Sequence, residues 1–140
     1  MKRTMLIGET GAGKSSLISA LSGEHFVSRR PMALEFCGPF INTPGEFLEN
    51  RRFYHALITT AADCEILLMV QDATRRTSVF PPQFAPIFNR TVLGVVTNTD
   101  APDANPERAE RFLHSAGARE MYRVSTATGE GLAALWQRLG

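Results

Sequence analysis

Short apolar runs alternate along the chain with segments in which apolar residues recur at helical spacing. A continuously apolar run such as Ile66–Val70 is typical of a strand that is covered on both faces of a sheet. Two shorter extended pieces flank the turn signal Gly38-Pro39. We therefore predict strands at Thr4–Ile7, Leu34–Cys37, Phe40–Ile41, Ile66–Val70, Val92–Val96 and Tyr122–Val124.

Helical spacing is clearest in Glu49–Ala62, where positions i, i+3, i+4, i+7 and i+8 from Phe53 share one face and predict an amphipathic helix. Asn105 followed by Pro106 is a typical helix start, and Gly117 is a typical stop. The predicted helices are Lys14–Ser22, Glu49–Ala62, a short one at Gln83–Phe88, one from Pro106 to Gly117, and Leu132–Leu139 with Trp136 in the core. Residues 23–34 and Thr74–Pro82 are predicted loops.

Strands and helices that alternate in this way form an α/β fold with a parallel sheet. We expect three layers, with five to six mostly parallel strands and helices on both faces. The length of 140 residues is that of one domain, over residues 1–140. Ligands of such sheets bind at the carboxyl ends of the strands, which is where the polar loops considered next fall.

Composition and charge narrow the class of protein. Hydrophobic residues make up 44% of the chain and the formal net charge is +1, so no strong field favours nucleic acid or an anionic membrane. No apolar stretch approaches the roughly 20 residues of a membrane span, and we expect a cytoplasmic protein. Cys64 is expected in the core. The histidines, His25, His55 and His114, have no metal-ligand spacing and are expected to be exposed or loosely packed.

Residues 8–15 read GETGAGKS, which matches G-x-x-x-x-G-K-[ST] between a predicted strand and a predicted helix. Such a loop turns its backbone N–H groups toward a phosphate, and the helix N-terminus adds a positive dipole end. Lys14 reaches the β and γ oxygens and the Ser15 hydroxyl binds Mg²⁺. The expected phosphate-binding residues are Gly8, Glu9, Thr10, Gly11, Ala12, Gly13, Lys14, Ser15 and Ser16. The chain is thus predicted to be a P-loop NTPase, small GTPase-like, that binds GTP or ATP with Mg²⁺.

The stretch INTPGEF resembles the D-x-x-G loop of nucleotide switches. The Gly45 N–H is expected to bind the γ-phosphate, and Glu46 is a candidate base beside Lys14, although a loop carboxylate can also be merely solvated. Asn42 stands where an Asp normally helps to hold hydrated Mg²⁺, so weak metal contact through water is expected. Pro31 lies where a threonine of the first switch would be sought, and hydrolysis is expected to be weak.

Two further loops are candidates for recognising the base. Residues 97–100 read TNTD, in the place of the N/T-K-x-D motif of guanine-binding proteins. Asp100 can accept hydrogen bonds from the guanine N1–H and 2-amino group, which adenine does not offer. Residues 124–131, VSTATGEG, resemble the second loop that borders the base. The predicted base-binding residues are Thr97, Asn98, Asp100, Ser125 and Thr126.

The whole pattern resembles the ethanolamine-utilisation protein P and propanediol-utilisation protein V family (EutP/PduV). The resemblance rests on MLIG before the glycine-rich motif and on TPGEFLENRRFYHALITTAAD, VQDAT, FPPQFAPIFNR and VLGVVT after it. It implies a small GTPase-like protein of bacterial microcompartments, in a family described both as GTPase-like and as having acetate kinase activity. The chain departs from the family pattern at Pro31, Asn42 and Asn98.

Three functions remain open from the sequence. The first is a nucleotide-dependent switch that engages a microcompartment shell or an encapsulated enzyme. The second is an acetate or small-carboxylate kinase, with Arg29, Arg75 or Arg76 binding the acceptor. The third is a scaffold whose nucleotide is permanently bound or absent.

Two smaller features also allow alternatives. Asp72 could approach Mg²⁺ or anchor its loop, and the latter is the commoner role of such a residue. The stretch FPPQFAPIF is expected to pack on the sheet, with a partner-docking surface as the alternative.

Overall fold

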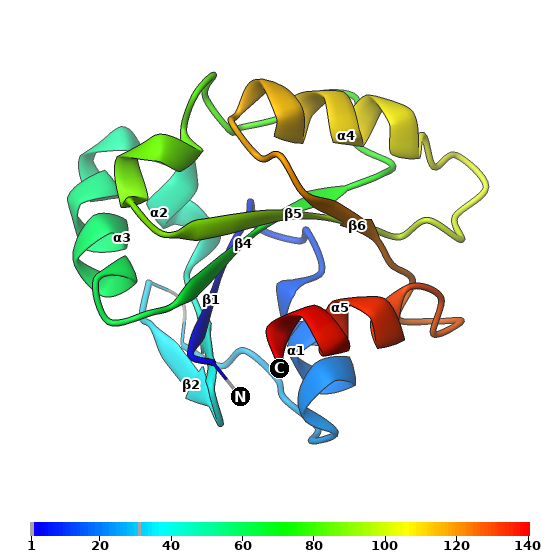
Figure 1. Ribbon diagram of the computed structural model, residues 1–140, viewed down its shortest axis with the longest axis horizontal. Helices are drawn as coiled ribbons and strands as arrows, with labels where there is room; N and C mark the ends of the chain where they lie inside the picture. Colours follow the sequence, from blue (N-terminus) through cyan, green and yellow to red (C-terminus); the bar gives the residue numbers. More distant parts are fainter. Residues whose placement is uncertain (1, 31) are drawn as a thin grey trace.

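Six strands form one sheet in the part of the chain that the computed structural model describes, residues 2–30 and 32–140 (Figure 1). The strand order is β2-β3-β1-β4-β5-β6, and every neighbouring pair is parallel except β2 and β3. The predicted α/β fold with a mostly parallel sheet is therefore confirmed. The strands are β1 (Thr4–Ile7), β2 (Glu35–Cys37), β3 (Phe40–Asn42), β4 (Ile66–Asp72), β5 (Thr91–Thr97) and β6 (Met121–Arg123).

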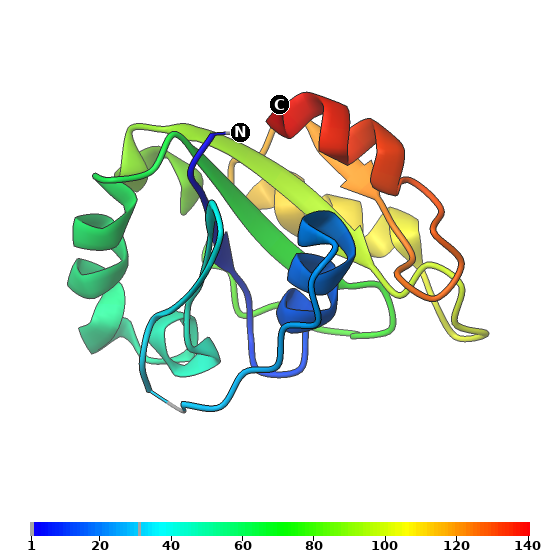
Figure 2. The same cartoon turned by 90° about the horizontal axis from the view of Figure 1, so that it is seen from below.

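Helices cover both faces of the sheet, which gives the three predicted layers (Figures 1 and 2). One face packs against α1 (Lys14–Ser22) and α5 (Leu132–Leu139). The other packs against α2 (Gly45–Glu49), α3 (Tyr54–Ala61) and α4 (Pro106–Ser115). Two apolar clusters, one on each side of the sheet, form the core.

The register of the central strands brings three loops together. β4 is buried along its whole length, as its continuous hydrophobicity predicts. Leu6 of β1 lies beside Leu68 of β4, and Asp72 at the end of β4 lies beside Thr97 at the end of β5. Because the strands are parallel, the loops that leave β1, β4 and β5 start at the same edge of the sheet.

The single helix predicted at Glu49–Ala62 is wrong, because Asn50 interrupts it. α2 ends at Glu49, a 3₁₀ turn, η1, spans Arg51–Phe53, and α3 begins only at Tyr54. Asn50 has an extended backbone (φ −122°, ψ 113°), and its side chain accepts a hydrogen bond from the Arg52 N–H. An Asn side chain that bonds to nearby backbone competes with the helix and starts a new one instead.

Trp136 was expected in the core, and the structure contradicts this because the side chain is 46% exposed. Leu135 and Leu139, four residues apart, occupy the face of α5 that meets the sheet. Trp136 is one helical step of about 100° further round, on the flank of a short helix. The spacing of apolar residues predicts the helix correctly, but the Trp136 side chain lies at the edge of the face that α5 buries.

The remaining expectations about packing are confirmed. Phe80, Phe84 and Phe88 are buried, with Phe84 packed edge-on against Phe88 at 5.1 Å between ring centroids. They belong to the segment around η2 (Ala85–Phe88), the short helix predicted at Gln83–Phe88. Cys64 is buried and the three histidines are exposed. Among the described residues, no helix is long and apolar enough to cross a membrane.

Candidate functional site

The glycine-rich loop, residues 8–15, connects β1 to α1 at the carboxyl edge of the sheet. Its backbone has positive φ angles at Gly11 (83°) and Gly13 (99°), which residues with a Cβ rarely adopt. A hydrogen bond from the Ala12 N–H to the Glu9 carbonyl (3.1 Å) closes the turn. Gly13 is the N-cap of α1 and provides no side-chain cap, so the first N–H groups of this helix can serve an external acceptor.

Lys14 is almost fully buried in this loop, with 7% of its surface exposed. Its Nζ donates to the carbonyl oxygens of Gly8 (2.7 Å) and Glu9 (3.0 Å). Burial lowers the pKa of Lys14 to about 8, although the nearby carboxylates of Glu49, Glu9 and Glu46 act in the opposite direction. The loop therefore holds a poorly solvated ammonium that donates to neutral carbonyl groups. An anion bound beside it would stabilise its charge.

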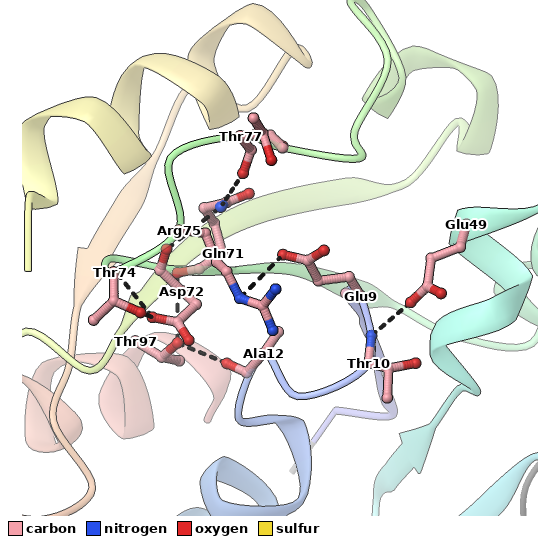
Figure 3. Close-up of polar contacts among 12 residues, drawn as sticks. Glu9, Thr10, Ala12, Glu49, Gln71, Asp72, Thr74, Arg75, Thr77 and Thr97 are labelled. Atoms are coloured by element: carbon pink, nitrogen blue, oxygen red, sulfur yellow. Dashed lines mark hydrogen bonds and ion pairs between the residues drawn. The ribbon is translucent and has the colours of Figure 1, made fainter.

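Thr97 ties the glycine-rich loop to the end of β5. Its hydroxyl donates to the Ala12 carbonyl oxygen at 2.7 Å, and the residue is 3% exposed (Figure 3). Gly13 lies against the same side chain, since a Cβ built there would meet Thr97 at 3.6 Å. The hydroxyl of Thr97 is thus used within the protein, and it fixes the distance between the two loops.

The other predicted base-binding residues differ in exposure: Ser125 is buried, Asn98 is half-buried, and Asp100 and Thr126 are exposed. The Asp100 carboxylate is exposed and accepts a hydrogen bond from the Ser125 hydroxyl (2.8 Å), which joins the two loops. Asn98 has φ 58°, a left-handed conformation in which Asn is the best tolerated residue after Gly. This backbone explains why an Asn suits a place where a Lys was expected. Thr126 is exposed.

α2 closes against the glycine-rich loop from the opposite side. Gly45 lies so close that an added Cβ would be 2.8 Å from the Cα of Thr10. The Glu49 carboxylate, at the end of α2, accepts a hydrogen bond from the Thr10 N–H at 2.7 Å (Figure 3). This contact places an acid at the mouth of the loop, and of the nearby carboxylates Glu49 raises the pKa of Lys14 most.

Arg75 reaches the loop from the segment after β4. Its Nε lies 3.8 Å from the Glu9 carboxylate (Figure 3). Its guanidinium is 3.4 Å from the position that a Cβ on Gly11 would take. Asp72 anchors this segment, because its Oδ1 accepts hydrogen bonds from the N–H (2.8 Å) and the hydroxyl (2.7 Å) of Thr74. Asp72 therefore has the loop-anchoring role of the two that its sequence allowed.

A cavity of about 500 Å³ lies between the glycine-rich loop, residues 28–30 and 32–35, and the start of α2. Most of the predicted phosphate and metal residues line it. They are Thr10, Gly11, Gly13, Lys14, Ser15, Ser16, Asn42, Gly45 and Glu46. Within the loop, Gly8 and Ala12 are buried and do not line the cavity, and the Glu9 side chain lies toward Arg75.

A second hollow runs from the same loop toward the base-recognition candidates. Ser15, Ser16 and Thr126 line it together with His25 and Phe26 of the segment after α1. Phe26 is held in place because its N–H donates to the Ser19 hydroxyl (2.9 Å) and its carbonyl accepts from the same hydroxyl (3.0 Å). An aromatic ring fixed beside two serines suits a flat ring such as a nucleobase.

Three residues of the site escaped sequence reasoning: Phe26, Glu35 and Glu49. The sequence predicts Glu49 only as the first residue of the helix Glu49–Ala62, although LENRR directly follows the TPGEF stretch. Glu35 faces the cavity only because β2 and β3 form an antiparallel hairpin that sets it opposite Asn42. The short turn at Gly38-Pro39 was the available signal for that pairing.

The oxygen atoms of the cavity are of the kind that Mg²⁺ prefers. Asn42 is 5% exposed, and its Oδ1 is buried without a hydrogen-bond partner among the described residues. Leaving such an acceptor unpaired costs about 1–3 kcal/mol. Ser15 and Asn42 therefore fit a magnesium ion that arrives with phosphates, the usual mode of Mg²⁺ binding in nucleotide sites. Pro31, the other departure noted in this region, lies outside the described residues.

The fold and the glycine-rich loop at the carboxyl edge of a mostly parallel sheet are consistent with an α/β fold like that of P-loop NTPases. Residues 1–140 match the sequence model of the PduV-EutP family, described as "Ethanolamine utilisation - propanediol utilisation". The chain belongs to this family, and the resemblance seen in the sequence is confirmed.

Individual relatives agree with this assignment. The chain is 38% identical over 135 residues to "Propanediol utilization protein PduV" of Citrobacter freundii, which covers 94% of this chain and 89% of the relative. It is 37% identical over 122 residues to "Probable acetate kinase EutP" of Escherichia coli K12, which covers 86% of this chain and 77% of the relative. The homologue of the same name from Salmonella typhimurium LT2 is 38% identical over the same length, with the same coverage.

Proposed function

We propose that the protein binds a nucleoside triphosphate, GTP or ATP, with Mg²⁺, and acts as a switch with weak hydrolysis in ethanolamine or propanediol utilisation. The observation that carries the proposal is the burial of Lys14 in the glycine-rich loop, where its hydrogen-bond partners among the described residues are two carbonyl oxygens. A desolvated ammonium at a helix N-terminus, facing a cavity of about 500 Å³, is a site for a polyphosphate.

The residues of the site divide the work of binding. Backbone N–H groups of residues 11–15 would donate to phosphate oxygens, and Lys14 would exchange its carbonyl partners for the anion. Gly45 packs against Thr10 of the glycine-rich loop, and its N–H would donate to the last phosphate. Bound Mg²⁺ would neutralise phosphate charge, with Ser15 and Asn42 as its protein contacts.

The same residues explain why hydrolysis is expected to be slow. Asn42 keeps the shape of an Asp but has no charge to offer a divalent ion. Glu46 lines the cavity and is half-buried, so it is the candidate base for an attacking water. A switch of this kind would act through the loops that border the triphosphate, which are residues 23–34 and α2.

Calorimetry tests the binding proposal. Non-hydrolysable GTP and ATP analogues would be titrated into the wild type and into Lys14→Ala, with and without Mg²⁺. We expect Lys14→Ala to weaken binding at least tenfold, since a charged hydrogen bond contributes about 1.5–3 kcal/mol. The matched control is Lys2→Ala, which changes the other lysine of the chain, an exposed one. Equal affinity of wild type and Lys14→Ala would overturn the proposal.

The alternative is an ATP-dependent kinase of acetate or another small carboxylate. Two observations favour it: relatives are named probable acetate kinases, and the Arg75 guanidinium lies over Gly11 of the loop. A carboxylate acceptor has no proton to remove, so the transfer needs positioning and charge rather than a strong base. Formation of acetyl phosphate from ATP above the background of Lys14→Ala would establish this activity, and its absence would exclude it.

Two further parts of the proposal concern the setting. The partner would be a microcompartment shell protein or an encapsulated enzyme, with the protein cytoplasmic or associated with the compartment. A nucleotide-bound scaffold without catalysis is the outcome if the isolated protein retains its nucleotide. Mass spectrometry of the supernatant after denaturation detects a retained nucleotide directly.

A further inference from the structure

The absence of an acid at position 42 is matched by a carboxylate on the neighbouring strand. β2 and β3 pair in antiparallel register, and Glu35 lies directly opposite Asn42. Side chains of such cross-strand pairs on one face of a sheet are neighbours, with Cβ atoms about 5 Å apart. Both residues line the cavity that also contains Ser15 and Lys14.

Glu35 is held firmly at this place. Its Oε1 accepts a hydrogen bond from the Ser28 hydroxyl (2.6 Å), and its Oε2 accepts from the N–H groups of Arg29 (2.9 Å) and Arg30 (3.3 Å). Burial acts against ionisation of Glu35. The pKa of Glu35 is nevertheless below its ordinary value, because hydrogen bonds to the carboxylate outweigh the effect of burial. These bonds come from Arg29, Ser28, Arg30 and the Asn42 side chain.

Asn42 itself points to a missing ligand. Its side chain is 5% exposed, and the described residues offer its Oδ1 no donor. A bound cation or a water of its hydration shell would supply the positive partner that this oxygen lacks. One neutral oxygen is a poor counterion for Mg²⁺, so a charged protein oxygen nearby would strengthen the binding that the phosphates provide.

We propose that Glu35 is the charged member of the Mg²⁺ site, acting beside Asn42 in place of the missing acid and through a metal-bound water. The inference rests on the proposed nucleotide binding, because the ion would arrive with the triphosphate. The acid has thus moved across the hairpin from β3 to β2. The same carboxylate orders residues 28–30, so a metal-bound water on Glu35 would link the ion to the loop that borders the nucleotide.

The experiment measures how much Mg²⁺ strengthens binding of the triphosphate analogue. The analogue selected by calorimetry is titrated into each variant in EDTA and in saturating Mg²⁺, and the ratio of the two affinities is compared. We expect Glu35→Gln to reduce this ratio about tenfold, in the range for residues that hold metal-bound water. Its affinity in EDTA should stay within about twofold of the wild type. Binding of Mn²⁺ to the protein–nucleotide complex, followed by electron paramagnetic resonance, gives a second readout that needs no activity.

Two further variants separate charge from shape. The double variant Glu35→Gln with Asn42→Asp returns one negative charge to the pair and should restore the Mg²⁺ ratio. Ser28→Ala removes one hydrogen bond to Glu35 but leaves its charge, and should leave the ratio near that of the wild type. Thermal unfolding of each variant shows that the fold is intact.

The outcomes distinguish the two proposals. An equal loss for Glu35→Gln in EDTA and in Mg²⁺ would mean that Glu35 only anchors residues 28–30, which overturns the metal role alone. Failure of the double variant to recover the Mg²⁺ ratio would overturn it as well. A wild type that binds neither analogue overturns the proposed function and this inference together.

Discussion

The two ends of the candidate nucleotide site are built differently. On the phosphate side, the glycine-rich loop is closed by its own hydrogen bonds, tied to β5 through Thr97, and covered by α2 through Gly45. On the base side, Asp100 is exposed and the segment from Thr126 to Glu130 is exposed throughout. Because the phosphate side is tightly packed, the loop would already have its binding conformation before a ligand arrives. A polyphosphate would then bind without the cost of ordering the loop.

The base side, by contrast, depends on few contacts. Its two loops are joined by a hydrogen bond from the Ser125 hydroxyl to Asp100 and by bonds from the Thr99 hydroxyl and N–H to the Val124 carbonyl. Selection between guanine and adenine would therefore rest on a single exposed carboxylate. We expect substitutions on the phosphate side to affect stability and binding together, and those on the base side to affect the choice of nucleotide.

The largest effect is expected for Gly45→Ala. The new Cβ would lie 2.8 Å from the Cα of Thr10, and backbone on both sides of the contact cannot move away cheaply. Overpacking of this kind lowers the free energy of unfolding by about 1–3 kcal/mol, and it would also separate α2 from the loop. Chemical denaturation measures the change. Gly140→Ala, where a Cβ would meet only ordinary contacts at 3.7 Å, is the control. Unchanged stability would show that the phosphate side is not tightly packed.

Thr97→Val tests the tie between the two sides. It removes the donor to the buried Ala12 carbonyl at nearly constant volume, and an unpaired buried acceptor costs about 1–3 kcal/mol. We expect lower stability and weaker binding of both analogues, because the glycine-rich loop loses its anchor. Thr99→Val, which removes a hydroxyl bond to the Val124 carbonyl, changes the base side alone and is the comparison. Equal effects of the two variants would contradict the difference drawn between the sides.

Sequence patterns predicted the phosphate side far better than its surroundings. The loop motif is local, and the buried strand Ile66–Val70 lies within β4, so hydrophobicity and spacing sufficed. The position of Glu35 depends on the register of a hairpin, and the hydroxyl of Thr97 points to the loop and away from the surface. Neither fact is contained in local spacing. Asn50 broke a helix through a side-chain hydrogen bond to the Arg52 N–H that periodicity does not register.

Asp100→Asn sharpens the comparison from the base side. If guanine is the base, Asp100 accepts from both of its N–H donors, and an amide oxygen accepts less strongly and adds a donor where none is wanted. We expect about a tenfold loss for the GTP analogue, equivalent to about 1.4 kcal/mol. Binding of the ATP analogue and the stability of the protein should not change. A similar loss for both analogues, measured by calorimetry, would remove the base-reading role from Asp100.

The smallest effect concerns the protonation of Lys14, whose pKa burial lowers to about 8 against the opposing carboxylates of Glu49, Glu9 and Glu46. The ammonium form prevails below that pH and would bind phosphate, whereas the neutral amine that prevails above it would not. Phosphate favours the charged form, so binding takes up a proton once the free protein has begun to lose it. Affinity should reach its full value about one unit or more below this pKa, and should fall about threefold between pH 7.5 and pH 8.5. Calorimetry in buffers of different ionisation enthalpy measures the proton uptake. Lys14→Arg, which stays charged throughout this range, should show neither the uptake nor the fall, whereas the same pH profile for both proteins would place the titrating group outside the phosphate side.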